Sequence, residues 1–185
     1  MSRSLRRLTA LGTTAVLGAL MLASAPTATA QDRESDYVCD PIYYRIKAAN
    51  RPMFNELAMT VAQSSWNHGS VIQYQWSGAS NQKWKLCRKR QSDGTEQVVF
   101  RDAWRQWCMG VDRNGPIGAW LVTVGCDANN VPDEQKFRLV TVPNTNYVAL
   151  QGVSSGKWFH AENFDSNGSQ IILGTTPDLW VLELA

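Results

Sequence analysis

The sequence predicts an all-β domain made of many short strands, and three observations lead to this prediction. Short apolar or alternating runs follow one another from Tyr43 onward. Turn residues, chiefly Gly, Asn, Asp and Pro, separate these runs. No window of helical length shows a clean 3.6-residue apolar period. The composition, 44% hydrophobic and 18% charged over 185 residues, is that of one globular domain or at most two small ones.

The first thirty residues are predicted to be a secretory signal peptide. Arg3, Arg6 and Arg7 form a basic start, residues 8–23 form an apolar stretch, and Ala28–Ala30 is a small-residue cleavage site. An uncleaved membrane anchor is the alternative, but the stretch is diluted by Thr and is shorter than the roughly 20 residues of a spanning helix. We therefore expect a secreted, extracellular protein with no membrane insertion after signal removal.

Removing the predicted signal changes the charge of the chain. The segment carries three Arg and no acidic residue, so 15 of the 18 basic residues remain beside 16 acidic ones, and the formal net charge changes from +2 to −1. A nearly neutral protein lacks the basic surface that attracts nucleic acid or anionic membrane. The charge therefore excludes nucleic acid as an expected partner.

The four cysteines, Cys39, Cys87, Cys108 and Cys126, all follow the predicted signal. In an oxidising compartment they are expected to form two disulfides, and three connectivities are open. A bridge between Cys108 and Cys126 would contribute about 3 kcal/mol and would leave Cys39 and Cys87 to join the start of the domain to a later strand. Because no C-x-x-C spacing occurs and there are two His, we expect no metal site and no cofactor.

Ten segments are predicted to be strands, because each combines β-branched or aromatic residues with turn residues at its ends. The segment nearest to a helical pattern, Pro52–Ala62, is expected to be irregular. In chain order the predicted strands are Tyr44–Lys47, Val71–Trp76, Lys83–Cys87, Val98–Arg101, Trp120–Val124, Lys136–Val140, Tyr147–Gln151, Lys157–Ala161, Gln170–Leu173 and Leu179–Leu184.

These strands group into three units with a shared order, each closed by a large aromatic residue. The closing aromatics Trp84, Phe137 and Trp180 lie 53 and 43 positions apart. Three units of four short strands predict a β-trefoil, in which one large aromatic per unit fills the central core. The predicted organisation is a signal peptide at 1–30, a polar arm at 31–42 and a trefoil at 43–185, with repeats at about 43–92, 93–142 and 143–185.

The closing motif of the first unit resembles that of a known family. Asn81–Trp84 reads NQKW, which is similar to the Gln-any-Trp motif of ricin-type β-trefoil lectins, a family that also occurs as carbohydrate-binding modules on secreted bacterial hydrolases. Gly69–Leu86 matches the closing half of such a repeat without a gap. Gln135–Phe137 is a degenerate copy, and Asp178–Trp180 keeps the aromatic alone. The resemblance implies a disulfide-bonded β-trefoil.

Two further segments carry the resemblance. Cys108 and Cys126 stand where the family often has a disulfide within one repeat. The third unit, Tyr147–Asn163, looks more like the repeats of fascin-type trefoils, which share the fold without the sugar pockets. Together the resemblance spans about residues 43–184. It implies that Gln82, Trp84, Gln135, Phe137 and Trp180 form the structural core of the repeats.

The resemblance also implies a sugar pocket in the first repeat. Pockets of this family use a carboxylate for hydroxyl groups, an aromatic ring for the C–H face of the sugar, and an Asn amide. The aromatic position falls on Tyr74, the amide on Asn81 and the carboxylate position on Thr60, which is a weaker, neutral acceptor. Trp66 and His68 border this carbohydrate-binding pocket. The alternative is that Tyr74 is an ordinary strand aromatic.

The other two repeats have lost these groups. Gly110 takes the acid position of the second repeat and Val124 its aromatic position, so no sugar site is expected there. The third repeat has no acid at the corresponding place and is expected to be structural. Its Trp158, His160 and Glu162 are candidates for a different surface site.

One short segment is a candidate protein-binding surface. Trp104 and Trp107 flank Arg105 just before a cysteine, and exposed aromatics with Arg are typical of interface hot spots. The alternative is that both rings pack around the neighbouring disulfide.

The sequence therefore predicts a secreted, non-catalytic carbohydrate-binding protein, lectin-like, whose partner is a glycan or polysaccharide. No G-x-S-x-G motif and no recurring carboxylate pair argues for an enzyme. The alternative is a protein-binding trefoil, such as a secreted protease inhibitor or an accessory subunit of a toxin or enzyme complex. Fold alone does not decide between the two functions.

Overall fold

A computed structural model describes residues 37–49, 56–63, 69–112, 119–127, 130–163 and 166–185, and these form an all-β structure. The predicted signal peptide and residues 31–36 of the polar arm lie outside the described residues. The strands are β1 (Val38–Cys39), β2 (Tyr44–Ala48), β3 (Leu57–Val61), β4 (Gly69–Gln75), β5 (Trp84–Arg90), β6 (Glu96–Asp102), β7 (Cys108–Val111), β8 (Leu121–Val124), β9 (Phe137–Thr141), β10 (Tyr147–Gly152), β11 (Trp158–Ala161), β12 (Ile171–Gly174) and β13 (Trp180–Leu184), with short 3-10 turns η1 (Ser80–Gln82) and η2 (Asp133–Gln135).

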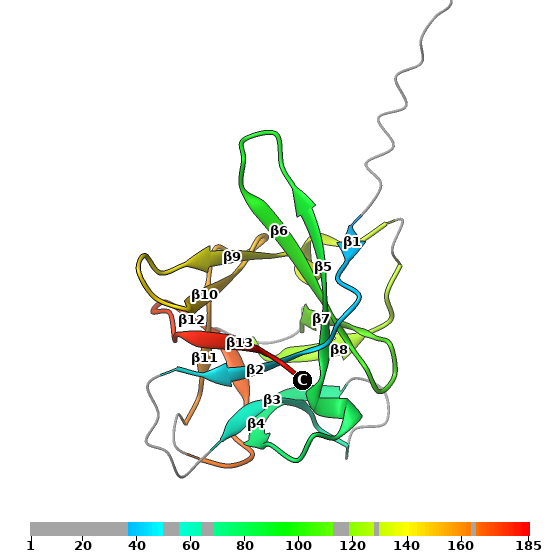
Figure 1. The fold of residues 1–185 in the computed structure, drawn as a ribbon, viewed down its shortest axis with the longest axis vertical. Helices are drawn as coiled ribbons and strands as arrows, with labels where there is room; N and C mark the ends of the chain where they lie inside the picture. Colours follow the sequence, from blue (N-terminus) through cyan, green and yellow to red (C-terminus); the bar gives the residue numbers. More distant parts are fainter. Residues whose placement is uncertain (1–36, 50–55, 64–68, 113–118, 128–129, 164–165) are drawn as a thin grey trace, which may run out of the picture. The chain divides into compact units, whose positions relative to one another are not determined.

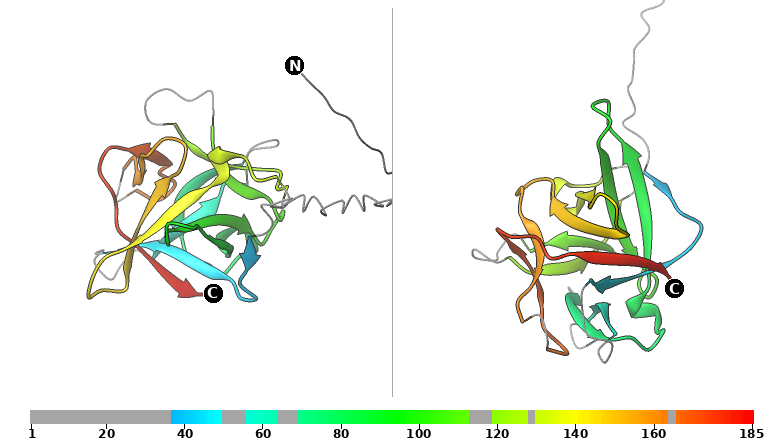
Figure 2. Two further views of the ribbon diagram at one scale, coloured as in Figure 1. Left: turned by 90° about the horizontal axis from the view of Figure 1, so that it is seen from above. Right: turned by 60° about the vertical axis from the view of Figure 1, so that its left-hand side comes forward.

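Six strands close into a barrel, and they are the first and last strands of each predicted repeat. The pairing runs β2–β5–β6–β9–β10–β13 and returns from β13 to β2, always antiparallel. The C-terminal strand β13, red in the drawings, lies beside β2 near the start of the domain (Figures 1 and 2). Because every edge of the barrel is paired, the sheet has no open edge there.

The remaining repeat strands form three hairpins, β3–β4, β7–β8 and β11–β12. The hairpins also touch one another, since β4 pairs with β8 at Gly69 and Ser70, and isolated bridges join Ile72 to Gln170 and Trp120 to Ile172. A barrel of six strands with three such hairpins is a β-trefoil, so the predicted fold is confirmed.

One hydrophobic core fills the space between barrel and hairpins. The closing aromatics Trp84, Phe137 and Trp180 have 0% of their surface exposed. Phe137 meets Phe159 edge to face with ring centroids 4.9 Å apart, and the Trp84 indole N–H donates to the Met59 carbonyl at 2.8 Å. Phe137, which closes the second repeat, thus contributes its ring to the same core as Trp84, which closes the first.

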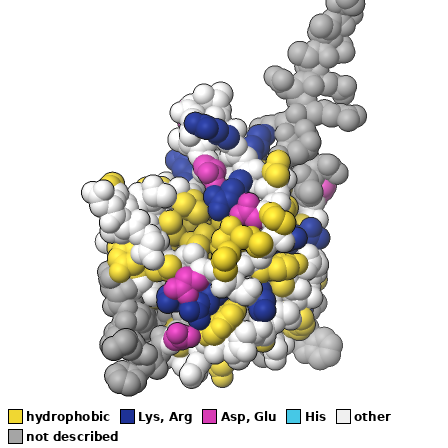
Figure 3. Space-filling model, in the orientation of Figure 1, with side chains coloured by type: hydrophobic (Ala, Val, Ile, Leu, Met, Phe, Trp, Pro, Cys, Tyr) yellow, Lys and Arg dark blue, Asp and Glu magenta, His cyan; other side chains and the backbone are white. Residues whose placement is uncertain are grey.

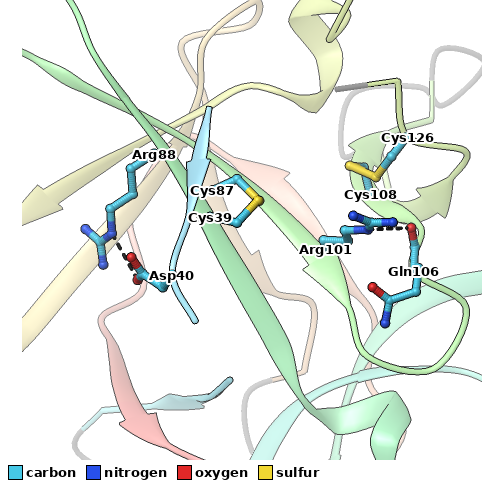
Figure 4. The surroundings of a disulfide bond; sticks show 8 residues. All are labelled: Cys39, Asp40, Cys87, Arg88, Arg101, Gln106, Cys108 and Cys126. Carbon is cyan, nitrogen blue, oxygen red and sulfur yellow. Dashed lines mark hydrogen bonds and ion pairs between the residues drawn. A yellow bond between two sulfur atoms is a disulfide. The ribbon is translucent and has the colours of Figure 1, made fainter. Parts of the chain in front are cut away.

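Two disulfides join the chain, which confirms the expected disulfide-bonded domain. Cys39 on β1 is the direct cross-strand partner of Cys87 on β5, and the two are bonded. Cys108 on β7 is bonded to Cys126 after β8 (Figure 4). The first bridge, together with the ion pair between Asp40 and Arg88 at 3.3 Å, attaches the end of the predicted arm to the barrel.

The expectation that Pro52–Ala62 is irregular is wrong for Leu57–Val61, which is strand β3. All five side chains of β3 are buried, because the hairpin packs on the core with one face and lies under η1 with the other. A strand buried on both faces shows no alternation of apolar and polar residues. Strand β7 was missed for a related reason, since its four residues include Gly110 and three of them are buried.

The face of the barrel seen in Figure 3 combines hydrophobic side chains with paired charges. Arg45 on β2 bonds to Glu183 on β13 through Nε at 2.6 Å and to Glu56 through a second nitrogen at 3.0 Å. Lys47 also pairs with Glu183. These contacts tie β2 to β13, where the barrel closes. Among the described residues no helix is long and apolar enough to cross a membrane.

Candidate functional site

The first hairpin borders a groove with a volume of about 410 Å³. The groove brings together four of the residues singled out from the sequence, namely Thr60, Tyr74, Asn81 and Gln82. None of the described residues that line it carries a charge. A groove of this size fits a small ligand, and its lining suits a neutral one.

Tyr74 supplies the aromatic surface of the groove. It lies on β4 directly opposite Ala58 on β3, so the two side chains point to the same face. Of the Tyr74 surface, 46% is exposed, whereas Ala58 is buried. The ring is therefore available to a ligand and does not belong to the core.

Gln82 fixes the shape of the groove. Its amide Nε2 donates to Thr60 Oγ1 at 3.1 Å and to the Gln75 carbonyl at 2.8 Å. Its Oε1 accepts from the Ser77 N–H at 2.7 Å and from the Ser77 hydroxyl at 2.9 Å. All strong hydrogen-bonding capacity of this side chain is used inside the protein, so its contribution is to hold η1 against β3.

Thr60 and Asn81 are the polar groups of the groove. The Thr60 hydroxyl donates to the Ala58 carbonyl at 2.9 Å and accepts from Gln82, so it keeps one lone pair for a ligand. Asn81 Nδ2 donates to the Val61 carbonyl at 2.8 Å, which orients the amide and leaves Oδ1 and a second N–H for ligand hydroxyls. The groove therefore offers neutral donors and acceptors where a related pocket would have a carboxylate.

The remaining predicted pocket residues do not contribute to this geometry. Trp66 and His68 lie outside the described residues. In the second repeat, a Cβ added at Gly110 would lie 3.2 Å from the Gln135 side chain, and Gln135 itself donates to the Gly125 carbonyl at 3.2 Å. The acid position of that repeat is thus filled by the neighbouring Gln.

The third repeat holds a contact that the sequence reasoning missed. His160 on β11 hydrogen bonds through Nδ1 to Asp178 Oδ1 at 3.2 Å, and Asp178 Oδ2 accepts from the Ala161 N–H at 2.7 Å. Aligning Trp180 with Trp84 places Asp178 on the position of Gln82, and the hairpin registers place His160 on the position of Thr60. That alignment is the signal that would have identified the pair. Glu162, the acid considered from the sequence, is exposed.

The β6–β7 turn presents the candidate protein-binding residues as a preorganised stack. The Arg105 guanidinium lies 4.0 Å from the Trp104 ring centroid and 5.2 Å from that of Trp107. Buried Asp102 holds the turn, because Oδ1 accepts from the N–H of Trp104 at 2.9 Å and of Arg105 at 2.6 Å, and Oδ2 accepts from the N–H of Trp107 at 2.8 Å. Trp104 is 38% exposed, so one ring of the stack reaches solvent.

Among the residues that the structure describes, no cluster of three or more His, Cys, Asp or Glu side chains could hold a metal ion.

Comparison with solved structures shows the same fold in proteins of low sequence identity. The designed threefold-symmetric protein ThreeFoil matches with 24% identity and a TM-score of 0.62, over 76% of this chain and 96% of that chain. The ricin B-like lectin of Macrolepiota procera, solved in complex with lactose, matches with 16% identity and a TM-score of 0.58, over 76% and 94%. The cytolethal distending toxin of Haemophilus ducreyi matches with 15% identity and a TM-score of 0.54, over 82% and 84%.

Neither a protein-family model nor a curated protein matches the sequence. The likeness to the Macrolepiota lectin confirms the resemblance to ricin-type β-trefoils at the level of the fold.

Proposed function

We propose that this chain is a secreted, non-catalytic carbohydrate-binding protein and that the groove of the first repeat is its sugar site. One observation carries the proposal: a single uncharged groove combines the exposed ring of Tyr74 with the oriented amide of Asn81. A sugar ring has an apolar C–H face and a rim of hydroxyls, and these two groups match both parts.

Binding would proceed by stacking the sugar on Tyr74 while Asn81 fixes the hydroxyls. Because Thr60 is a neutral acceptor, each hydroxyl contact there contributes about 1 kcal/mol, against roughly 1.5–3 kcal/mol for a carboxylate. We expect a dissociation constant near 1 mM, which corresponds to about 4 kcal/mol. Binding should change little with salt, since the lining residues that the structure describes carry no charge. The fold shared with a lectin that was solved with lactose supports this assignment.

A glycan array followed by titration of the best sugar tests the proposal. Tyr74→Ala should lose measurable binding, whereas Tyr74→Phe should keep it, because the ring remains. Tyr43→Ala removes a ring that lies under Lys85 on the barrel and is the matched control. Binding that survives Tyr74→Ala, or a blank array with the folded protein, would refute the sugar site.

A protein-binding role through the β6–β7 turn is the second candidate, and the contact of the Arg105 guanidinium with two tryptophan rings favours it. Such rigid aromatic and cationic groups are typical hot spots. A protein that copurifies with the wild type and with Tyr74→Ala, but not with Trp104→Ala, would support this role over the lectin role.

Secretion has its own test. The protein recovered from the medium of expressing cells should begin at Gln31 by N-terminal sequencing, because cleavage is expected after Ala30. A chain that stays in the membrane with residues 1–30 attached would contradict this.

A further inference from the structure

The outer face of the third hairpin carries two aromatic side chains on one strand, Trp158 and His160. On β11 and β12, Trp158 is the direct partner of Gly174, and His160 is the direct partner of Ile172. On the other side of Ile172 lies Trp120, joined to it by an isolated bridge. Directly opposed residues point to the same side of a sheet, so these five residues share one surface, named here the third-hairpin face.

The burial pattern shows that this surface faces outward. Phe159 and Ala161 on β11, which alternate with Trp158 and His160, lie in the core with at most 1% exposed. On the outer side, Trp120 is 48% exposed and the His160 side chain 35%. The third-hairpin face is therefore an accessible patch next to a rigid core.

A shorter connection explains why His160 is more exposed than Thr60, the residue at the same position of the first repeat, which is 4% exposed. Trp84 lies ten positions after Tyr74, but Trp180 lies six positions after Gly174. The longer connection of the first repeat forms η1, which packs against β3. The shorter one has no 3-10 turn, and its residues 175–177 are exposed.

The polar centre of the face is a His160 ring held in one orientation. Its Nδ1–H donates to Asp178 Oδ1 at 3.2 Å, and Asp178 is anchored by the Ala161 N–H. In the neutral imidazole this leaves Nε2 as a hydrogen-bond acceptor. A Cβ at Gly174 would lie 3.1 Å from His160 Cβ and 3.4 Å from its Cγ, so the glycine is what allows the His160 side chain to lie there.

The third hairpin exchanges the aromatic and the small residue of the first. In the first hairpin Ala58 lies opposite Tyr74, whereas in the third Trp158 lies opposite Gly174. The ring thus moves to the other strand of the pair, and Trp120 adds a second ring on the far side of Ile172. By strand geometry, Trp120 lies about 10 Å from His160, and Trp158 about 7 Å further along β11.

We propose that the third-hairpin face is a second binding site, for a neutral oligosaccharide of at least two sugar units. The two indoles would pack on the C–H faces of different sugar rings, and His160 Nε2 would accept a hydroxyl between them. Size favours a sugar over a protein, because protein interfaces use about 20–30 residues a side and this patch has five. The patch holds no Lys or Arg, and the Asp178 carboxylate is engaged by His160 and a backbone N–H, which matches a neutral ligand.

The groove of the first repeat and the third-hairpin face use different residues, so the binding test of one can fail while that of the other succeeds. The test uses the folded mature chain with soluble galacto-, xylo-, cello- and malto-oligosaccharides of two to six units, and the monosaccharides for comparison. In ¹H–¹⁵N spectra, the indole N–H signals of Trp120 and Trp158 should move with a chain of two or more units and much less with the monosaccharide. Trp120→Ala should weaken that binding at least tenfold.

Several variants separate this site from its alternatives. Trp120 is exposed, so its removal leaves the core intact, and Trp158→Ala gives an independent measure on the other strand. Tyr74→Ala should leave the Trp120 and Trp158 shifts unchanged, and Trp104→Ala is the control for an exposed tryptophan elsewhere. Unmoved Trp120 and Trp158 signals at tens of millimolar oligosaccharide would overturn the proposal, and so would wild-type affinity in both Trp→Ala variants.

Discussion

The β6–β7 turn provides the sharpest test of how this chain positions its surface tryptophans. Asp102 is fully buried, and its two oxygens accept three backbone N–H bonds from the turn. In Asp102→Asn one oxygen becomes an NH₂ group. The remaining oxygen can still serve Trp104 and Arg105, but the NH₂ then faces the N–H of Trp107, and two donors meet.

The cost follows from the contacts. The variant loses one hydrogen bond to a charged acceptor, about 1.5–3 kcal/mol, and leaves one backbone donor unpaired, about 1–3 kcal/mol. Removing the desolvated charge returns part of this sum. We expect the free energy of unfolding to fall by about 3 kcal/mol.

The third repeat shows that the turn itself does not require a carboxylate. Gly152 stands at the position of Asp102, and there the Lys157 N–H is bonded to the Ser155 hydroxyl at 3.2 Å. In both repeats the turn residue with positive φ lies at the same place, Gly156 at 65° and Gln106 at 62°. Asp102 is therefore needed to accept the Trp107 N–H, because the second repeat has no Ser at the position of Ser155.

Urea unfolding followed by tryptophan fluorescence measures the effect, with the disulfides intact and the slope m compared between variants. Asp133→Asn is the matched control, because this side chain is 69% exposed and pairs with Lys136 on the surface. Its loss should stay below about 0.5 kcal/mol. If Asp102→Asn were as stable as the control variant, the buried carboxylate would not be what holds the turn.

Three further changes test other parts of the structure. Replacing Cys108 and Cys126 with Ala should lower the free energy of unfolding by about 3 kcal/mol in urea titrations, since their bridge closes 18 positions. Gly110→Asp should lower the melting temperature without creating a sugar site, because its Cβ would lie 3.2 Å from Gln135. Burial raises the pKa of Glu183, but hydrogen bonds from Lys47 and Arg45 lower it by more, so the pKa lies below its ordinary value of 4.5. Its stabilising contribution is present at neutral pH and is lost as the pH falls through that lowered pKa, so Glu183→Gln should melt earlier than wild type at pH 7, and the difference in melting temperature should shrink as the pH falls below 4.5.

The sequence was sufficient for the fold because the barrel strands and the closing aromatics obey simple patterns. Every predicted strand overlaps an observed one, and Trp84, Phe137 and Trp180 meet in one core. The two strands that were missed within the repeats, β3 and β7, belong to hairpins whose side chains are buried on both faces or include Gly110. In such strands the period of two disappears, and local pattern carries no signal.

The candidate site was harder to predict, because exposure depends on what lies above a strand. Trp120 read as an ordinary strand residue, yet its ring lies at the outer edge of the third hairpin and is 48% exposed. Thr60 stands where an open pocket would need an acceptor, but η1 and Gln82 leave 4% of it exposed. The residues next to Trp120 and Thr60 in the sequence do not indicate how exposed either side chain is. Both exposures depend on the length of a connection that lies later in the chain and packs near these residues.

One position, two residues before the closing aromatic, therefore plays a different part in each of the three repeats. Gln82 in the first repeat bonds to Thr60 and holds a neutral groove beside Tyr74. Gln135 in the second lies against Gly110 and leaves no room for an acid. Asp178 in the third instead holds His160, and its short connection uncovers the hairpin. Because the backbone geometry is shared, these differences in side chain and connection length are what separates a binding repeat from a structural one. On this reasoning, lengthening the third connection to that of the first should bury His160 as Thr60 is buried, and so weaken binding at the third-hairpin face while leaving the first groove unchanged.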